Sequence, residues 1–257
     1  MTTIPTGRFV WFDYVAKDIA KAQGFFGELF NWKTQEIPAQ DGKSSYTMIR
    51  LGETTIGGYM PTPKGAPEVG HWLSHLQTPD AKATAEKITS IGGKVLKAPE
   101  KMGDYGTMAI VADNGGGVFA LWQPAKAEGT GDYKGAPGAF CWNELAAHDP
   151  NKAIAFYSQL GFTAEKMDMP GMTYNVLNSD GKGRAGVLQS PMPDAPQAWM
   201  PYVQVENCDA TVAKATKLGS TVRVPPNDVP GVGRLAVFTD PQGGWIGLLQ
   251  PSPDMKK

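Results

Sequence analysis

The sequence predicts an α+β fold made of four βαβββ modules, and three observations lead to this prediction. Residues 105–124 align without a gap on residues 232–251, an offset of 127, and share Gly, Ala, Asp, a Gly pair, Leu, Gln and Pro. The starts of the two copies align with an offset of 131, Trp11 on Trp142. Inside each copy, the order strand, helix, three strands occurs twice. Matching order and spacing indicate a tandem duplication of a two-module domain.

The first module shows this pattern most clearly. Residues 9–16 (FVWFDYVA) predict a strand, and Asp18 is a candidate N-cap for a helix over 19–30 whose apolar residues recur at helical spacing. Apolar runs around Trp32 and at 46–51 and 55–60, separated by Gly and Asp turns, predict the three further strands.

The other three modules repeat this order. In copy one, a strand at 71–76 precedes a helix that Pro79-Asp80 caps and Gly92-Gly93 ends. In copy two, helices are predicted over 150–159 and 210–218, with Cys208 in the turn before the second. The predicted domains are therefore 1–123 and 139–257, joined by a Gly, Ala and Pro-rich linker at 124–138.

Charge and composition restrict the partners. With 24 basic and 25 acidic residues and no run of like charge, neither nucleic acid nor a membrane surface is an expected partner. No secretory signal or membrane-length apolar run is found, which predicts a cytoplasmic protein. The two cysteines, Cys141 and Cys208, are expected to be free thiols that pack as small apolar residues.

An acid stands beside a tryptophan on one face of each copy's first strand. Alternate strand residues share a face, which places Trp11 with Asp13 and Trp142 with Glu144. Burying a carboxylate next to an indole is costly unless a partner satisfies it, so these acids need a structural or a functional reason.

The segments Asp18 to Phe26 and Asp149 to Phe162, with the glycine turns at 113–117 and 240–244, resemble the vicinal oxygen chelate superfamily of glyoxalases, bleomycin-resistance proteins and extradiol dioxygenases. The resemblance covers nearly the whole chain and is closest to bacterial tandem two-domain members. It implies that each domain forms a half-open, U-shaped mixed sheet around a cavity, with helices outside.

The resemblance also implies a divalent metal, but this sequence departs from the ligand pattern. The family's first-strand and last-strand ligand positions fall on Trp11, Ala120, Trp142 and Gly247, and the remaining ones fall near Gly57, Leu73, Gly186 and Met200. None of these residues ligates a metal, so no metal site or cofactor is expected. A metal held by relocated ligands is the alternative.

Two strand positions further on, polar residues face the expected cavity. They are Asp13 and His75 in copy one, and Glu144 and Tyr202 in copy two. Asp13, His75 and Glu144 are the candidate catalytic residues, and Asp13 with His75 could act as a general acid–base pair. The alternative is that the acids accept hydrogen bonds that hold the cavity together.

The candidate ligand-binding residues are mostly aromatic: Trp11, Trp122, Trp142, Tyr202 and Trp245, with Arg234 in a Gly-rich loop available to an acidic ligand. Such a lining suits a planar or apolar small molecule, unless the indoles plug the cavity. The hypothesis is a small-molecule-binding protein, monomeric or homodimeric, with a degenerate metal site. The alternative is a metal-dependent lyase or dioxygenase of glyoxalase type that uses Asp13, His75 or Glu144.

Overall fold

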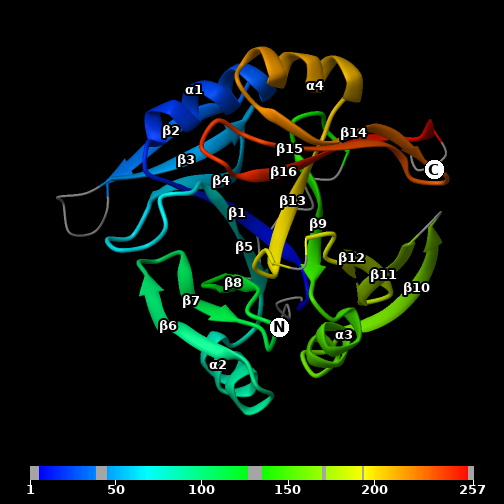
Figure 1. Ribbon diagram of the computed structural model, residues 1–257. Coiled ribbons are helices and arrows are strands. Elements are labelled where there is room, and N and C mark those ends of the chain that lie inside the picture. The colour runs from blue at the N-terminus through cyan, green and yellow to red at the C-terminus, as the bar shows by residue number, and fades with distance from the viewer. Residues whose placement is uncertain (1–5, 39–44, 127–134, 170–171, 193, 254–257) are drawn as a thin grey trace. The chain divides into compact units, whose positions relative to one another are not determined.

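Four modules of one strand, one helix and three strands follow one another in the computed structural model, which describes residues 6–38, 45–126, 135–169, 172–192 and 194–253 (Figure 1). This confirms the predicted α+β fold. The elements are β1 (Phe9–Ala16), α1 (Ile19–Phe30), β2 (Lys33–Pro38), β3 (Ser45–Leu51), β4 (Thr54–Pro61), β5 (His71–Gln77), α2 (Ala81–Ser90), β6 (Lys94–Met102), β7 (Gly106–Ala112), β8 (Val118–Pro124), β9 (Phe140–Ala147), α3 (Pro150–Ser158), β10 (Thr163–Met169), β11 (Met172–Ser179), β12 (Lys182–Gln189), β13 (Ala198–Gln204), α4 (Cys208–Lys217), β14 (Thr221–Val229), β15 (Gly233–Thr239) and β16 (Trp245–Pro251).

Side-chain caps fix where the helices begin. Asp18 accepts a hydrogen bond from the backbone N–H of the third residue after it, as an N-cap should, and so does Asp149. The prediction for α4 was wrong: Asn207 is its N-cap, and Cys208 is its first residue rather than part of the preceding turn. Because Asn207 accepts from Ala210 N, the helix starts two residues earlier than its apolar pattern indicated.

The strands pair in the same way in each module. Its last three strands are antiparallel neighbours, and the last strand then pairs in parallel with the first. The two sheets run β2-β3-β4-β1-β5-β8-β7-β6 and β10-β11-β12-β9-β13-β16-β15-β14. In all four modules, a polar residue of the first strand is paired with a small residue of the last: Asp13 with Gly58, His75 with Ala120, Glu144 with Gly186 and Tyr202 with Gly247.

The chain divides into two compact units, and each contains one module from each copy. Unit one comprises Met1–Val10, Leu73–Asp132 and Trp142–Met200, and unit two comprises Trp11–Trp72, Tyr133–Cys141 and Pro201–Lys257. Unit one therefore holds the modules β5–β8 and β9–β12, and unit two holds β1–β4 and β13–β16. The predicted linker, 124–138, lies in part outside the described residues, and its first residue, Pro124, ends β8.

Each unit has a core to which both of its modules contribute. In unit one, Ala85 and Ile88 of α2 belong to the same buried cluster as Phe156 and Tyr157 of α3. In unit two, α1 and α4 are neighbours, and the Phe25 and Phe238 rings lie 6.2 Å apart (Figure 1). The modules of a unit are therefore joined by apolar burial, which is non-directional and scales with area. None of the described helices has the length and apolarity needed to span a membrane.

Candidate functional site

A hydrogen-bonded cluster of Trp11, Asp13 and Tyr46 lies on one face of β1 and β3. The Trp11 indole Nε1 donates to Asp13 Oδ1 at 3.0 Å and to Tyr46 Oη at 2.8 Å. The Tyr46 hydroxyl donates to the same Oδ1. Asp13 shares a face with Trp11, as strand alternation predicts, and it accepts hydrogen bonds, as the alternative to a catalytic role expects. The tyrosine was not predicted.

Copy two builds the same cluster from Trp142, Glu144 and Tyr174. Trp142 Nε1 donates to Tyr174 Oη at 2.7 Å, and the Tyr174 hydroxyl donates to Glu144 Oε2 at 2.9 Å. Here the phenol, and not the indole, is the donor to the carboxylate. The order of donation, indole to phenol to carboxylate, is the same in both copies.

A glycine next to each acid makes room for the phenol. A Cβ at Gly58 would lie 1.9 Å from Tyr46 Oη, and one at Gly186 would lie 1.8 Å from Tyr174 Oη. No side chain fits at these distances, so both clusters require glycine there. The sequence held a signal for this arrangement, because twelve residues separate Tyr46 from Gly58 and Tyr174 from Gly186.

The two carboxylates differ in exposure. Asp13 is 2% exposed, whereas Glu144 is half-buried. Burial, followed by the charge of the neighbouring carboxylate, raises the pKa of Tyr46 and of Tyr174 well above the ordinary value. Both phenols therefore stay protonated at neutral pH and act as donors to the acids.

Apolar side chains surround each cluster. In copy one, Ile37 is paired with Tyr46, and the half-buried Met48 lies two residues along β3 on the same face. In copy two, Tyr174 is paired with both Met167 and Leu188. Met167 is 39% exposed. Together with the aromatic rings, the half-buried Met48 and the exposed Met167 form an adaptable apolar surface of the kind that binds flat molecules.

The second module of each copy places the other predicted aromatic residues. The Tyr202 ring covers Gly247, where a Cβ would lie 2.3 Å from it. Trp122 lies against Gly106, and the Arg223 guanidinium lies 5.4 Å from the centre of the Trp245 ring. Both tryptophans are half-buried.

His75 is 3% exposed and belongs to unit one, whereas Asp13 belongs to unit two. Their action as an acid–base pair therefore stays a prediction.

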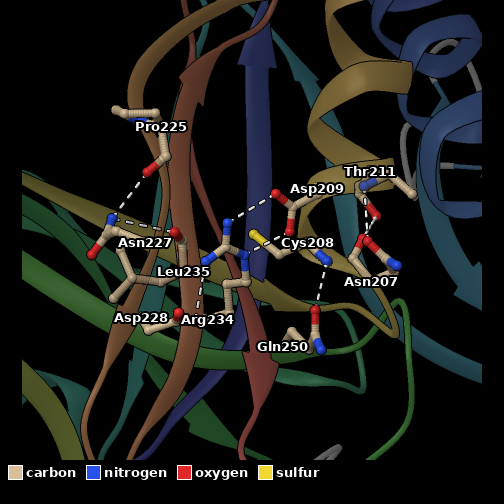
Figure 2. Close-up of polar contacts among 11 residues, drawn as sticks. Asn207, Cys208, Asp209, Thr211, Pro225, Asn227, Asp228, Arg234, Leu235 and Gln250 are labelled. Atoms are coloured by element: carbon tan, nitrogen blue, oxygen red, sulfur yellow. Dashed lines mark hydrogen bonds and ion pairs between the residues drawn. The ribbon is translucent and has the colours of Figure 1, made fainter.

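Arg234 lies within β15 and not in the preceding loop, contrary to the prediction (Figure 2). Its Nε and Nη2 donate to the two carboxylate oxygens of Asp209 at 2.6 and 2.9 Å, and its Nη1 lies 3.1 Å from Asp228. These hydrogen bonds raise the pKa of Arg234 and lower that of Asp209. An acidic ligand would have to displace these carboxylates to bind Arg234.

Cys208 lies beside this ion pair and is fully buried (Figure 2). Burial, followed by the charge of Asp209, raises the pKa of its thiol to about 11. Its backbone N–H donates to Gln250 Oε1 at 2.9 Å. Cys208 is thus a buried, protonated thiol, as predicted, and it is not a nucleophile.

The residues at the family's metal positions do not fit a metal. The described residues contain no group of three or more His, Cys, Asp or Glu side chains that could hold an ion. The acid of each cluster accepts a hydrogen bond from a phenol, and among the described residues neither acid belongs to a set of three possible ligands. At the family's ligand positions, Gly57, Ala120, Gly186 and Gly247 offer no ligating side-chain atom.

Known proteins resemble the chain over almost its whole length. A protein of Mycobacterium tuberculosis (strain CDC 1551 / Oshkosh) named "Putative glyoxylase CFP32" is 34% identical over 95% of this chain and 94% of its own length. The "Anthracycline biosynthesis protein DauV" of Streptomyces sp. (strain C5) is 30% identical over 97% and 95%.

Solved structures show the same fold at low identity. The Mn(II)-bound glyoxalase of Novosphingobium aromaticivorans has a TM-score of 0.63 at 16% identity, covering 96% of this chain and 82% of that one. The 2,2',3-trihydroxybiphenyl 1,2-dioxygenase of Sphingomonas wittichii strain RW1 has a TM-score of 0.67 at 12% identity, covering 98% and 94%. Residues 8–121 and 141–248 each match the family itself. The chain therefore belongs to the Glyoxalase/Bleomycin resistance protein/Dioxygenase superfamily.

Proposed function

We propose that this protein binds planar, apolar small molecules on two faces. The first ligand face is the side of β1–β4 that carries Trp11, and the second is the side of β9–β12 that carries Trp142. One observation carries the proposal: a tryptophan, a tyrosine and an acid are hydrogen-bonded in the same order in both copies, beside half-buried apolar side chains.

The chemistry of these faces favours apolar contact. The indole N–H and phenol O–H groups of each cluster donate to oxygens within it, so the rings and thioethers offer a ligand an apolar surface. Burying about 200 Å² of apolar ligand surface would supply about 5 kcal/mol before the costs of association. DauV carries a name from anthracycline biosynthesis, and anthracyclines contain a planar polycyclic ring system, which supports a flat ligand here.

The other aromatic residues extend the proposal. We include Trp122, Tyr202 and Trp245 as ligand contacts: Trp122 and Tyr202 each pack against a glycine, Gly106 and Gly247, and Trp245 is half-buried beside Arg223. The setting we propose is the cytoplasm, with which two free cysteines agree. A monomer and a homodimer are both compatible with this function.

Fluorescence titration tests the proposal. A panel of naphthalene, anthracene and naphthoquinone derivatives should quench the tryptophan emission saturably. By calorimetry, the double variant Trp11→Ala/Trp142→Ala should bind at least about tenfold more weakly, because it loses the largest ring of each face. Tyr105→Phe, an exposed aromatic residue outside both faces, is the matched control. Absence of saturable quenching across the panel would refute the proposal.

The second candidate function is a metal-dependent lyase or dioxygenase that uses Asp13, His75 or Glu144. The names of the glyoxalase and dioxygenase relatives favour it. We propose that the protein instead works without a metal held by its own side chains, because the donor set described above is incomplete. Metal analysis of protein purified without an affinity tag decides between them: a stoichiometric divalent ion supports the enzyme and contradicts our proposal.

A further inference from the structure

We infer that Tyr46 and Tyr174 set the ligand preference of the two faces toward electron-poor planar rings such as quinones. This inference rests on the proposed function, since it names the class of planar molecule that the same faces select. It assigns the tyrosines a role in specificity, which acts through the electron density of the neighbouring rings.

The direction of the hydrogen bonds is the first step. Each indole N–H is directed into its cluster, Trp11 Nε1 to two oxygens and Trp142 Nε1 to one. The phenols donate to the carboxylates. A ligand on either face therefore meets the ring faces and not a donor hydrogen.

The second step is electronic. A phenol that donates to an anionic carboxylate gains electron density, and the phenol oxygen in turn accepts the indole N–H. Aromatic faces already carry negative quadrupole potential, and the carboxylate beside them, buried at Asp13 and half-buried at Glu144, strengthens it, because the surrounding dielectric is below that of water. The raised pKa values of both tyrosines keep these protons in place over the neutral range. Such faces attract rings whose own faces are electron-deficient.

The third step concerns the glycines next to the acids. Both copies have a glycine there, Gly58 and Gly186, and the absence of a side chain leaves room for the phenol oxygen. A phenylalanine with a small neighbour would fill the same space without that oxygen. The acid differs between copies, Asp13 against Glu144, yet the phenol bond is present in both. The phenol oxygen is thus the element that both copies share, which agrees with a role in ligand preference.

A matched pair of probes tests this inference: 2,3-dimethyl-1,4-naphthoquinone and 2,3-dimethylnaphthalene, which are nearly equal in size. The methyl groups block addition of cysteine to the quinone ring. We expect the quinone to bind about tenfold more tightly, with a long-wavelength charge-transfer absorption band that the hydrocarbon lacks. In Tyr46→Phe/Tyr174→Phe, the hydrocarbon should bind as before, whereas the preference should fall to about threefold or less and the band should shift to shorter wavelength.

Tyr105→Phe controls for the substitution itself, because that side chain is 62% exposed. Equal binding of the two probes by the unaltered protein, or an undiminished preference in the double variant, would overturn the inference and leave the proposed function intact. If neither probe binds, the proposed function fails instead. Should the double variant not fold, the charge-transfer band of the unaltered protein decides, and its absence counts against the inference.

Discussion

Asp113 and Asp240 are equivalent residues of the two copies, and each is buried in a different compact unit. In unit one, the Tyr157 hydroxyl of α3 donates to Asp113 Oδ2 at 2.9 Å. In unit two, the Tyr14 hydroxyl of β1 donates to Asp240. The same phenol–carboxylate bond therefore forms from a helix in one unit and from a strand in the other.

The two tyrosines come from different positions of the repeat. At the offset of 131, Tyr14 of unit two corresponds to Leu145 of unit one, and Phe26 of unit two corresponds to Tyr157 of unit one. At these two positions, each unit therefore has one phenol. Trp199 Nε1 also donates to Tyr157 Oη at 3.0 Å in unit one.

The unit two counterpart of Trp199 is Trp72, at an offset of 127, and it faces Phe26, which has no hydroxyl. Among the described residues, the buried Trp72 Nε1 has no hydrogen-bond partner.

A glutamine and a glycine also exchange positions between the units. Gln197 of unit one lies opposite Gly115, whereas in unit two the position equivalent to Gly115 is Gln242, and it lies opposite Gly70, the equivalent of Gln197. Both amides accept a backbone N–H from the turn before a helix, from His148 and Asp18 respectively. The turn before the helix is therefore held by a glutamine in both units, although the two glutamines come from different positions of the repeat.

The ligand faces behave differently from these buried aspartates. There, tryptophan, tyrosine and glycine occupy equivalent places in both copies, and only the acid changes from Asp13 to Glu144. The donors of a purely structural bond have exchanged positions between copies, whereas the donors on the ligand faces have not. This contrast supports a role for the Trp–Tyr pairs beyond holding the sheet together.

Removing a buried aspartate should have the largest effect. Asp113→Ala would remove the acceptor of four donors, the Tyr157 hydroxyl, the Gln197 amide and the N–H groups of Gly115 and Gly117, whereas Asp240 accepts from three. We expect the free energy of unfolding to fall by about 3–5 kcal/mol, and by less in Asp240→Ala, because fewer donors converge on Asp240. Urea denaturation followed by circular dichroism measures both. A larger loss in Asp240→Ala would contradict the ranking.

The exchange of tyrosines can be repeated by mutation in unit two. Tyr14→Leu should destabilise the protein by about 2–3 kcal/mol, because a core phenol and its bond to Asp240 are lost. Adding Phe26→Tyr recreates the arrangement of unit one and supplies Trp72 Nε1 with an acceptor, so about 1–2 kcal/mol should return. A double-mutant cycle measures the coupling. Purely additive effects would show that the two arrangements are not interchangeable.

The glutamine exchange should have a smaller effect. In unit one, a Cβ at Gly115 would lie 2.4 Å from the Gln197 amide, so Gly115→Gln alone should cost about 1–3 kcal/mol through overpacking. The second change, Gln197→Gly, vacates that space and copies unit two, and it should recover about half of the loss. Thermal unfolding of the two single variants and the double variant tests this. A double variant less stable than either single one would exclude the exchange.

Much of the fold could be predicted from the sequence, because periodicity and duplication are local signals. The start of α4 was missed because its cap, Asn207, precedes the apolar pattern. Trp11, Asp13, Trp142 and Glu144 could be placed on their faces from strand alternation alone.

The tyrosines of the clusters could not be placed in this way. Tyr46 contacts Trp11 across 35 residues of chain, and only the folded sheet order brings β3 within reach of β1. The ion pairs of Arg234 were missed for the same reason, since Asp209 is 25 residues away on α4.

The smallest expected effect is a difference in pH dependence. Burial raises the pKa of Asp240, against the opposing hydrogen bonds from Tyr14 and the glycine turn. A group whose pKa is higher in the folded state contributes stability below its unfolded pKa, about 3.9 for an aspartate, and loses it as the pH rises through the folded pKa. Asp240→Asn does not titrate, so the stability of the unaltered protein relative to this variant should decline from about pH 4 upward.

Urea titrations of the two proteins at half-unit pH steps from about 4 to 7 would measure this decline, which should stay below about 2 kcal/mol. The backbone N–H groups of Gln242 and Gly244 donate to Asp240 at 2.6 and 3.4 Å, and burial raises its pKa in spite of these bonds. A relative stability that is constant or rises with pH would show that the donors outweigh burial at Asp240.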